Sequence, residues 1–240
     1  GHYAVLNVTT GIINTLIGGM AATALTDGNA NTALGYSTLR TNTSAHANVA
    51  IGSSALYTLN IASDTSSYNT AVGHSAGLSV STGIKNTLIG GLTGDALTDA
   101  DYNVAMGHNA LGADTLGSRS VAIGYAALQT QNFGSATDTY NTAVGHGAGS
   151  NVTTGVSNTF IGGLAGETNS IGTYNTGIGR GALASSLDAD CNTVVGYQAG
   201  ASITSGGSNV CIGFNSGVYQ DNLTTGTNNT AMGQAALDAL

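Results

Sequence analysis

Histidines recur at one place of an internal repeat, and imidazoles at a regular spacing could bind a metal ion. Four of the five histidines share this place: His2, His74, His108 and His146. If the place lined a threefold axis, three imidazoles could together hold a metal ion or an anion. However, Tyr36, Arg180 and Phe214 take the same place in other copies of the repeat. That tolerance favours a packing or surface column over a metal site, and we expect no cofactor.

Acidic residues gather in the polar segments between the apolar cores of the repeat. Asp99 with Asp101, and Asp188 with Asp190, could hold Ca²⁺ or serve as the paired carboxylates of a glycosidase. Asp in such segments more often caps its own turn, and the calcium-binding nonapeptide pattern of other β-rolls is absent. No Ser-His-Asp or Cys-His grouping recurs. We therefore expect no catalytic residues and a protein that is not an enzyme, with a depolymerising tailspike as an alternative.

The charge of the chain argues against two classes of partner. Only 7% of residues are charged, four of them are basic, and the net charge is −8. Nucleic-acid binding needs a cationic surface that displaces counterions, so we expect no nucleic-acid partner. No apolar run approaches the roughly 20 residues of a membrane-spanning helix, so we expect no membrane insertion of this segment.

One short pattern, N-[TV]-x-[ILVM]-G-x-x-[AST], repeats along the whole chain. Its first residue, place zero, is Asn14, Asn31, Asn48, Asn69, Asn86, Asn103, Ser120, Asn141, Asn158, Asn175, Asn192, Asn209 and Asn229. Successive copies are 17 residues apart, except at three intervals of 20 or 21. A fixed short period over a chain rich in glycine and apolar residues indicates a solenoid.

A 17-residue unit is too short for a pair of helices, and its core of Thr, Val and Ile is typical of a strand. The sequence therefore predicts an all-β, parallel β-solenoid of about 14 coils over residues 1–240, a single repeat domain and a fragment of a longer fibrous protein. Stacked coils lie about 4.8 Å apart. The Asn at place zero should form a structural ladder, because each amide can both donate and accept hydrogen bonds. Side chains alternate along a strand, and we expect places +1 and +3 to face the interior.

Two further expectations concern packing. Place +2 is large at Leu16, Leu88 and Phe160, and place +5 of each of these coils is Gly. Interiors are close-packed, so this trade suggests that the two places share one volume. Cys191 and Cys211 fall on opposite faces of different coils, too far apart for a disulfide, and we expect two free, largely buried thiols.

The segments Asn48-Val-Ala-Ile-Gly52 and Ser120-Val-Ala-Ile-Gly124 resemble the head repeats of YadA-type trimeric autotransporter adhesins. The wording from Asn69 to Gly77 also resembles repeat regions of phage tail fibres. This resemblance implies a left-handed β-roll, a homotrimer whose strands pack about a shared axis, and an extracellular place on a virion tail fibre or a bacterial surface. The 17-residue repeat is longer than the repeat of about 14 residues in the adhesin heads.

Independently, apolar or small residues occupy both faces of the strand, so a symmetric copy is the simplest cover for the second face. The two longer intervals carry candidate binding loops for a cell-surface glycan or protein receptor: Tyr57, Asp64, Tyr68, Gln129, Asp138 and Tyr140. A neutral insertion is the alternative. We expect a structural or adhesive fibre segment, with a stand-alone glycan- or ice-binding solenoid as the alternative. Ice binding is disfavoured if the recurring Thr at +1 is interior.

Overall fold

The chain forms a parallel β-solenoid of about 12 turns at a spacing of about 17 residues, which confirms the predicted fold class with slightly fewer coils than expected. The computed structural model describes residues 3–4, 6–61, 65–218 and 224–237. The chain divides into two compact units, residues 1–119 with 133–137, and residues 120–132 with 138–240. The left hand of the coil and the homotrimer remain predictions.

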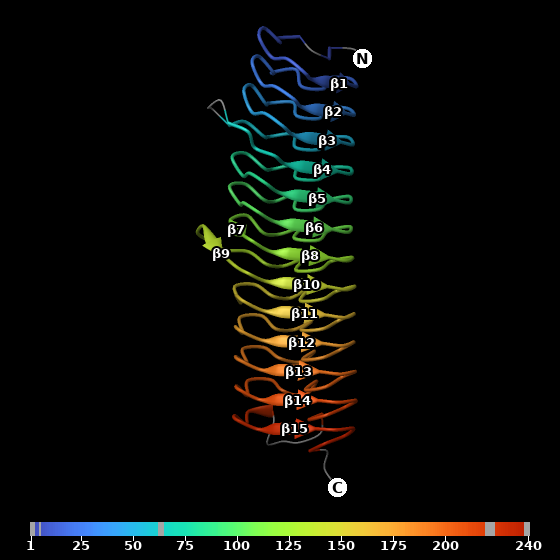
Figure 1. Cartoon of the computed structure of the whole chain (residues 1–240), viewed down its shortest axis with the longest axis vertical. Helices are drawn as coiled ribbons and strands as arrows, with labels where there is room; N and C mark the ends of the chain where they lie inside the picture. The colour runs from blue at the N-terminus through green and yellow to red at the C-terminus, as the bar shows by residue number, and fades with distance from the viewer. Residues whose placement is uncertain (1–2, 5, 62–64, 219–223, 238–240) are drawn as a thin grey trace. The chain divides into compact units, whose positions relative to one another are not determined.

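In the first unit, one short strand marks each copy of the repeat. The strands are β1 (Thr15–Ile17), β2 (Thr32–Leu34), β3 (Val49–Ile51), β4 (Thr70–Val72), β5 (Thr87–Ile89) and β6 (Val104–Met106), followed by a two-residue β7 (Gly117–Ser118). Strands β1 to β6 pair in sequence order and in parallel (Figure 1). Ile17 pairs with Leu34, and Leu34 pairs with Ile51, so equivalent residues stack as the repeat predicts.

The second unit repeats this arrangement. Its strands are β8 (Val121–Ile123), β10 (Thr142–Val144), β11 (Thr159–Ile161), β12 (Thr176–Ile178), β13 (Thr193–Val195), β14 (Val210–Ile212) and β15 (Thr230–Met232). Each pairs in parallel with the next in the same register. A two-residue β9 (Thr137–Asp138) lies in the longer interval before β10.

The structure reverses the predicted orientation of the strands. Ala33 is buried between a half-buried Thr32 and an exposed Leu34, and the middle residue is likewise the buried one in every later strand of the stack. The expectation that places +1 and +3 face the interior is therefore wrong. The reason is that place +2 shares its face with the Asn at place zero, whose amide finds its hydrogen-bond partners inside the coil.

Glycine at place +4 turns the chain out of each strand. Gly35 and Gly90 have φ of 143° and 137°, a region that other residues rarely adopt. A Cβ on Gly90 would lie only 2.6 Å from the carbonyl oxygen of Gly107 in the next coil. Both the backbone conformation and the close approach of stacked coils therefore require glycine.

The interior is filled by places +2 and +8, and the two exchange volume. Ala33, Ala50 and Ala105 at +2 accompany Leu39, Leu56 and Leu111 at +8, whereas Leu88 and Phe160 at +2 accompany Gly94 and Gly166. A Cβ on Gly94 would lie 2.9 Å from Leu88 Cδ2, so these side chains compete for one space. The predicted exchange with place +5 is wrong, because place +5 lies outside the coil.

Among the described residues, no helix has both the length and the apolar character needed to cross a membrane.

Candidate functional site

The outward side of the strands carries two parallel columns of side chains, which we call the outer sheet face. In the first unit the columns consist of Thr15, Thr32, Val49, Thr70, Thr87 and Val104 beside Ile17, Leu34, Ile51, Val72, Ile89 and Met106. In the second unit they consist of Val121, Thr142, Thr159, Thr176, Thr193, Val210 and Thr230 beside Ile123, Val144, Ile161, Ile178, Val195, Ile212 and Met232. All of these side chains are half-buried or exposed. Ile17 is 55% exposed, Ile161 39% and Ile178 36%. A continuous apolar surface of this kind marks an interaction site.

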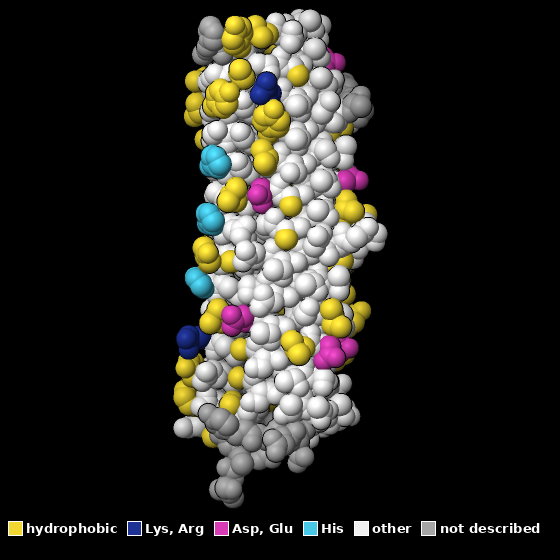
Figure 2. All heavy atoms as spheres, turned by 180° about the vertical axis from the view of Figure 1, so that it is seen from behind, with side chains coloured by type: hydrophobic (Ala, Val, Ile, Leu, Met, Phe, Trp, Pro, Cys, Tyr) yellow, Lys and Arg dark blue, Asp and Glu magenta, His cyan; other side chains and the backbone are white. Residues whose placement is uncertain are grey.

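Two more columns border the outer sheet face. The leading-edge column is the residue just before place zero: Ile13, Ala30, Ala47, Tyr68, Lys85, Tyr102 and Arg119, and in the second unit Tyr140, Ser157, Tyr174, Cys191, Ser208 and Asn228. The trailing-edge column is place +5: Gly19, Tyr36, Ser53, His74, Gly91 and His108, and in the second unit Tyr125, His146, Gly163, Arg180, Tyr197, Phe214 and Gln234. Most of these side chains are exposed. Figure 2 shows imidazoles in the open at one margin of a surface that is mostly uncharged and polar.

Aromatic and cationic side chains interlock along each edge. In the leading-edge column the cations of Lys85 and Arg119 lie 4.9 and 4.8 Å from the ring of Tyr102. In the trailing-edge column Tyr197 stacks on Phe214 at 5.2 Å and lies beneath Arg180 at 5.7 Å. Such stacking holds the edge side chains in defined positions, because cation–π and stacked-ring contacts are directional.

The Asn side chains at place zero point inward and form a continuous hydrogen-bonded ladder within each unit. The backbone N–H of Asn86 donates to Asn69 Oδ1 at 2.9 Å, and Asn86 Nδ2 donates to the Ala100 carbonyl at 2.7 Å. The same pair of contacts recurs at Asn158, which receives the backbone N–H of Asn175. Each net hydrogen bond stabilises the fold by about 0.5–1.5 kcal/mol. The ladder is therefore part of the scaffold that holds the outer sheet face.

One rung of the ladder lacks Asn, and a side chain from a different place supplies the missing amide. Ser120 stands at place zero, and its hydroxyl accepts a hydrogen bond from Gln131 Nε2 at 2.8 Å. Gln131 Oε1 accepts from Asn141 Nδ2 at 2.9 Å. Gln131 is fully buried. The sequence pattern recorded the substitution at Ser120 but gave no sign of Gln131, which follows it by 11 residues.

The candidate binding loops are only partly where the sequence placed them. Tyr57 lies in a coil, with the Arg40 guanidinium 5.6 Å from its ring, and Gln129 is half-buried. Tyr68 and Tyr140 are 58% and 57% exposed, but they belong to the leading-edge column and not to a loop tip. Asp64 lies outside the described residues.

The second insert does form an exposed loop. Phe133 is buried, and its carbonyl accepts a hydrogen bond from the Thr115 hydroxyl at 3.3 Å. Residues 134–136 are exposed. Asp138 is exposed and accepts a hydrogen bond from the Tyr140 hydroxyl at 3.3 Å. This segment can therefore contact another molecule without disturbing the coils.

The acidic side chains cap turns. Asp101 Oδ1 accepts the backbone N–H of Ile84 at 2.7 Å, and Asp190 Oδ1 accepts that of Thr173 at 2.6 Å. Asp99 accepts a threonine hydroxyl from the preceding coil. These hydrogen bonds between neighbouring coils occupy the carboxylates in the way expected of turn Asp residues.

Two carboxyl groups have shifted pKa values. Hydrogen bonds from the side chains of Ser44 and Thr26 lower the pKa of the exposed Asp27. Burial raises the pKa of Asp95, because desolvation disfavours its charged form. Neither carboxyl is accompanied by a second acid in a cleft.

His74, His108 and His146 are exposed in the trailing-edge column, and His2 lies outside the described residues. His74 and His108 are separated by one coil, in which Gly91 takes the same place. Among the described residues, no three His, Cys, Asp or Glu side chains lie together as a metal site would need.

Both cysteines are free, as predicted. The expectation that both are buried is wrong for Cys191, which is exposed because the leading-edge column faces outward. Cys211 is buried at place +2, and burial raises the pKa of its thiol.

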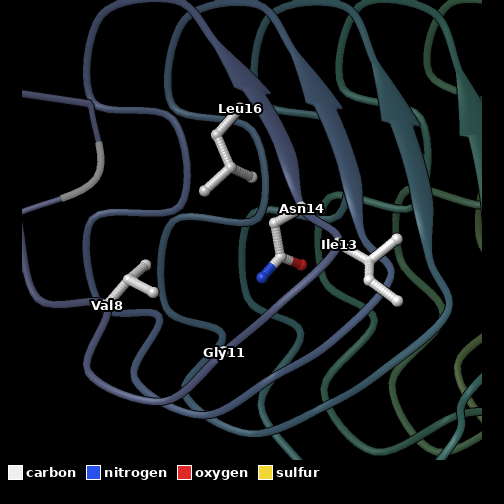
Figure 3. Close-up of a pocket in the computed structure, with 5 residues that line it drawn as sticks. All are labelled: Val8, Gly11, Ile13, Asn14 and Leu16. Carbon is white, nitrogen blue, oxygen red and sulfur yellow. The ribbon is translucent and has the colours of Figure 1, made fainter.

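Two depressions appear in the first unit, and neither holds a set of reactive groups. One, of about 340 Å³, is lined by Val8, Gly11, Ile13, Asn14 and Leu16. Figure 3 shows Asn14 and Leu16 pointing into the interior of the first described coil, and Ile13 pointing away from it. The other, of about 490 Å³, contains His46, whose Nδ1 accepts the backbone N–H of Asn29 at 2.7 Å. That imidazole holds two coils together.

No family model, no curated protein and no solved structure matches this chain.

Proposed function

We propose that the chain is a structural or adhesive fibre segment that assembles with copies of itself, as a homotrimer, through the outer sheet face. The observation that carries the proposal is the exposed aliphatic column beside the column of Thr and Val in every described coil. Water contact with such a surface is unfavourable by about 25 cal/mol per Å². A copy of the same chain offers an equally long surface with the same spacing of coils, so it matches the face along its length.

The resemblance to trimeric adhesin heads and phage tail fibres supports three chains and an extracellular location, on a virion or a bacterial surface. The exposed residues 134–136 and Asp138 are then the segment that we propose contacts a cell-surface glycan or protein receptor. Loops on a rigid scaffold commonly carry recognition. The scaffold itself is proposed to span distance and not to catalyse a reaction.

The test is the mass of the assembly in a variant that charges the outer sheet face. In Ile161→Asp/Ile178→Asp each carboxylate would be buried near its symmetry mates, at a cost of several kcal/mol per ion. Each lost isoleucine also removes about 0.5–1 kcal/mol of burial, given that little over a third of each side chain is still exposed in one copy. Light scattering should give three chains for the original protein and a single 23.5 kDa chain for the variant.

A matched control carries the same added charge elsewhere. Asn151→Asp/Ser185→Asp places two carboxylates on exposed residues of the polar turns and should leave the three-chain mass unchanged. Circular dichroism should show folded protein in both variants. A single-chain mass for the original protein at micromolar concentration would refute self-assembly.

Ice binding is the second candidate, because the Thr column proves to face outward. Thr32, Thr70 and Thr87 stand half-exposed on stacked strands of the first unit, which removes the objection raised by an interior Thr. A monomer that shows thermal hysteresis, lost in Thr70→Lys/Thr87→Lys, would favour this candidate. A trimer would cover the same Thr column and exclude it.

A further inference from the structure

The residue types of the two edge columns are matched within each coil. Every Tyr of the leading-edge column has an imidazole or a guanidinium six residues later in the trailing-edge column, and every described His or Arg of the trailing-edge column has such a Tyr. The four pairs are Tyr68 with His74, Tyr102 with His108, Tyr140 with His146, and Tyr174 with Arg180.

Side-chain size is matched in further coils. Large trailing-edge residues accompany small leading-edge ones: Tyr36 with Ala30, Tyr197 with Cys191, and Phe214 with Ser208. Glycine accompanies large leading-edge residues: Gly19 with Ile13, and Gly91 with Lys85. The matching is therefore one of both chemistry and volume.

Contacts inside one chain do not explain this matching. The two members of a pair stand at opposite ends of a strand, and the three strand residues alone span about 10 Å. Along each column the neighbours are residues of the adjacent coils, as Tyr197 is for Phe214. A pair drawn from the same coil needs a second molecule to bring its members together.

A rotation axis parallel to the stacking direction, in front of the outer sheet face, supplies that second molecule. Rotation about such an axis sets the leading edge of one copy against the trailing edge of the next, and it shifts nothing along the axis. Residues of the same coil then meet. Tyr beside His or Arg forms a favourable stacked or cation–π contact, and a large side chain beside a small one fills the rim without a clash.

We infer that copies of this chain assemble in parallel and in coil-for-coil register, with the leading edge of each copy packed against the trailing edge of its neighbour. This inference rests on the proposed self-assembly and deepens it, because it names the rim pairs and fixes the axial register. The outer sheet face supplies a nearly uniform apolar surface, which by itself would allow slippage by one coil. The non-uniform edge columns prevent such slippage.

The exposed Cys191 of the leading-edge column allows a direct test. Its matched trailing-edge residue is Tyr197, so Tyr197→Cys should place two thiols face to face across each interface. Mild oxidation should then yield a covalent ring of three chains on a denaturing gel. In Arg180→Cys and Phe214→Cys the introduced thiol lies one coil away, offset by about 4.8 Å along the axis, beyond easy disulfide reach. Cross-linking in these two variants should be several-fold lower.

A second pair guards against a folding defect at Tyr197. In a Cys191→Ser background, Ser157→Cys/Gly163→Cys uses the matched residues of another coil. A Cβ at Gly163 meets nothing closer than 3.9 Å, so the substitution fits. Cross-linking of this pair should equal that of the first.

The outcomes separate the inference from the proposed function. A single-chain mass by light scattering would overturn self-assembly and the rim pairs together. A three-chain mass with no cross-link in either matched pair, or with equal cross-linking in the offset variants, would overturn the rim register and leave the assembly intact. Covalent dimers only, in the matched variants, would overturn the threefold assembly and retain the coil-for-coil register.

Discussion

Replacing Phe160 by Ala tests how the interior of the solenoid shares its volume. The Phe160 ring is fully buried and faces Gly166 at place +8 of the same coil. Phe160→Ala should destabilise the protein by about 3–5 kcal/mol, because it removes a large apolar side chain and leaves a cavity. Gly166→Leu alone should cost about 1–3 kcal/mol, because its side chain would be forced against the ring.

The double variant Phe160→Ala/Gly166→Leu should be more stable than Phe160→Ala. It recreates the combination of Ala33 with Leu39, in which the large side chain comes from place +8. Leucine already adopts the required left-handed backbone at this place, as Leu183 does with φ of 54°. The residual loss should be about 1–2 kcal/mol, the cost of that conformation for a residue with a Cβ. The two changes should therefore be non-additive by at least about 2 kcal/mol.

Guanidinium denaturation followed by circular dichroism measures these differences. The control is Phe160→Ala/Gly163→Leu, which adds the same leucine at place +5, outside the coil. It should show no recovery, since that leucine cannot reach the cavity. Additive losses in Phe160→Ala/Gly166→Leu, or equal recovery in the control, would refute the account of the core.

Three further variants test single contacts. Gln131→Ala removes the amide that completes the ladder and should cost about 1–3 kcal/mol of unfolding free energy, whereas Gln129→Ala, at a half-buried site, should change it by less than about 0.5 kcal/mol. Gly90→Ala should lower the melting temperature by several degrees more than Gly91→Ala, since only the former has a positive φ and meets the next coil; equal losses would refute this. For Asp95, whose folded pKa is raised above its unfolded value, protonation favours the folded state, so stability falls as pH rises through the folded pKa. Asp95→Asn should accordingly be more stable than the original at pH 7, with the gain lost below pH 3.8, and an unchanged melting temperature at pH 7 would contradict the burial of this carboxylate.

The repeat determined most of the fold without coordinates. A fixed period of 17 residues, an Asn at place zero and a Gly at place +4 predict stacked coils, because one coil cannot bury its own apolar residues. The stacking of Ile17 on Leu34 and Leu34 on Ile51 follows from the period alone. The free thiols follow from the places of Cys191 and Cys211 in the repeat.

The tertiary structure alone decided which face of the strand is interior. Alternation along a strand separates Thr32 and Leu34 from Ala33, but both sets are apolar or small enough to be buried, so the pattern cannot choose between them. The choice depends on where the amide at place zero finds partners and on how large a side chain the narrow coil can hold. Volume exchange is likewise invisible in the pattern, because Leu88 correlates with both Gly91 outside and Gly94 inside. Only the path of the chain around the coil brings Gly94, and not Gly91, against the leucine.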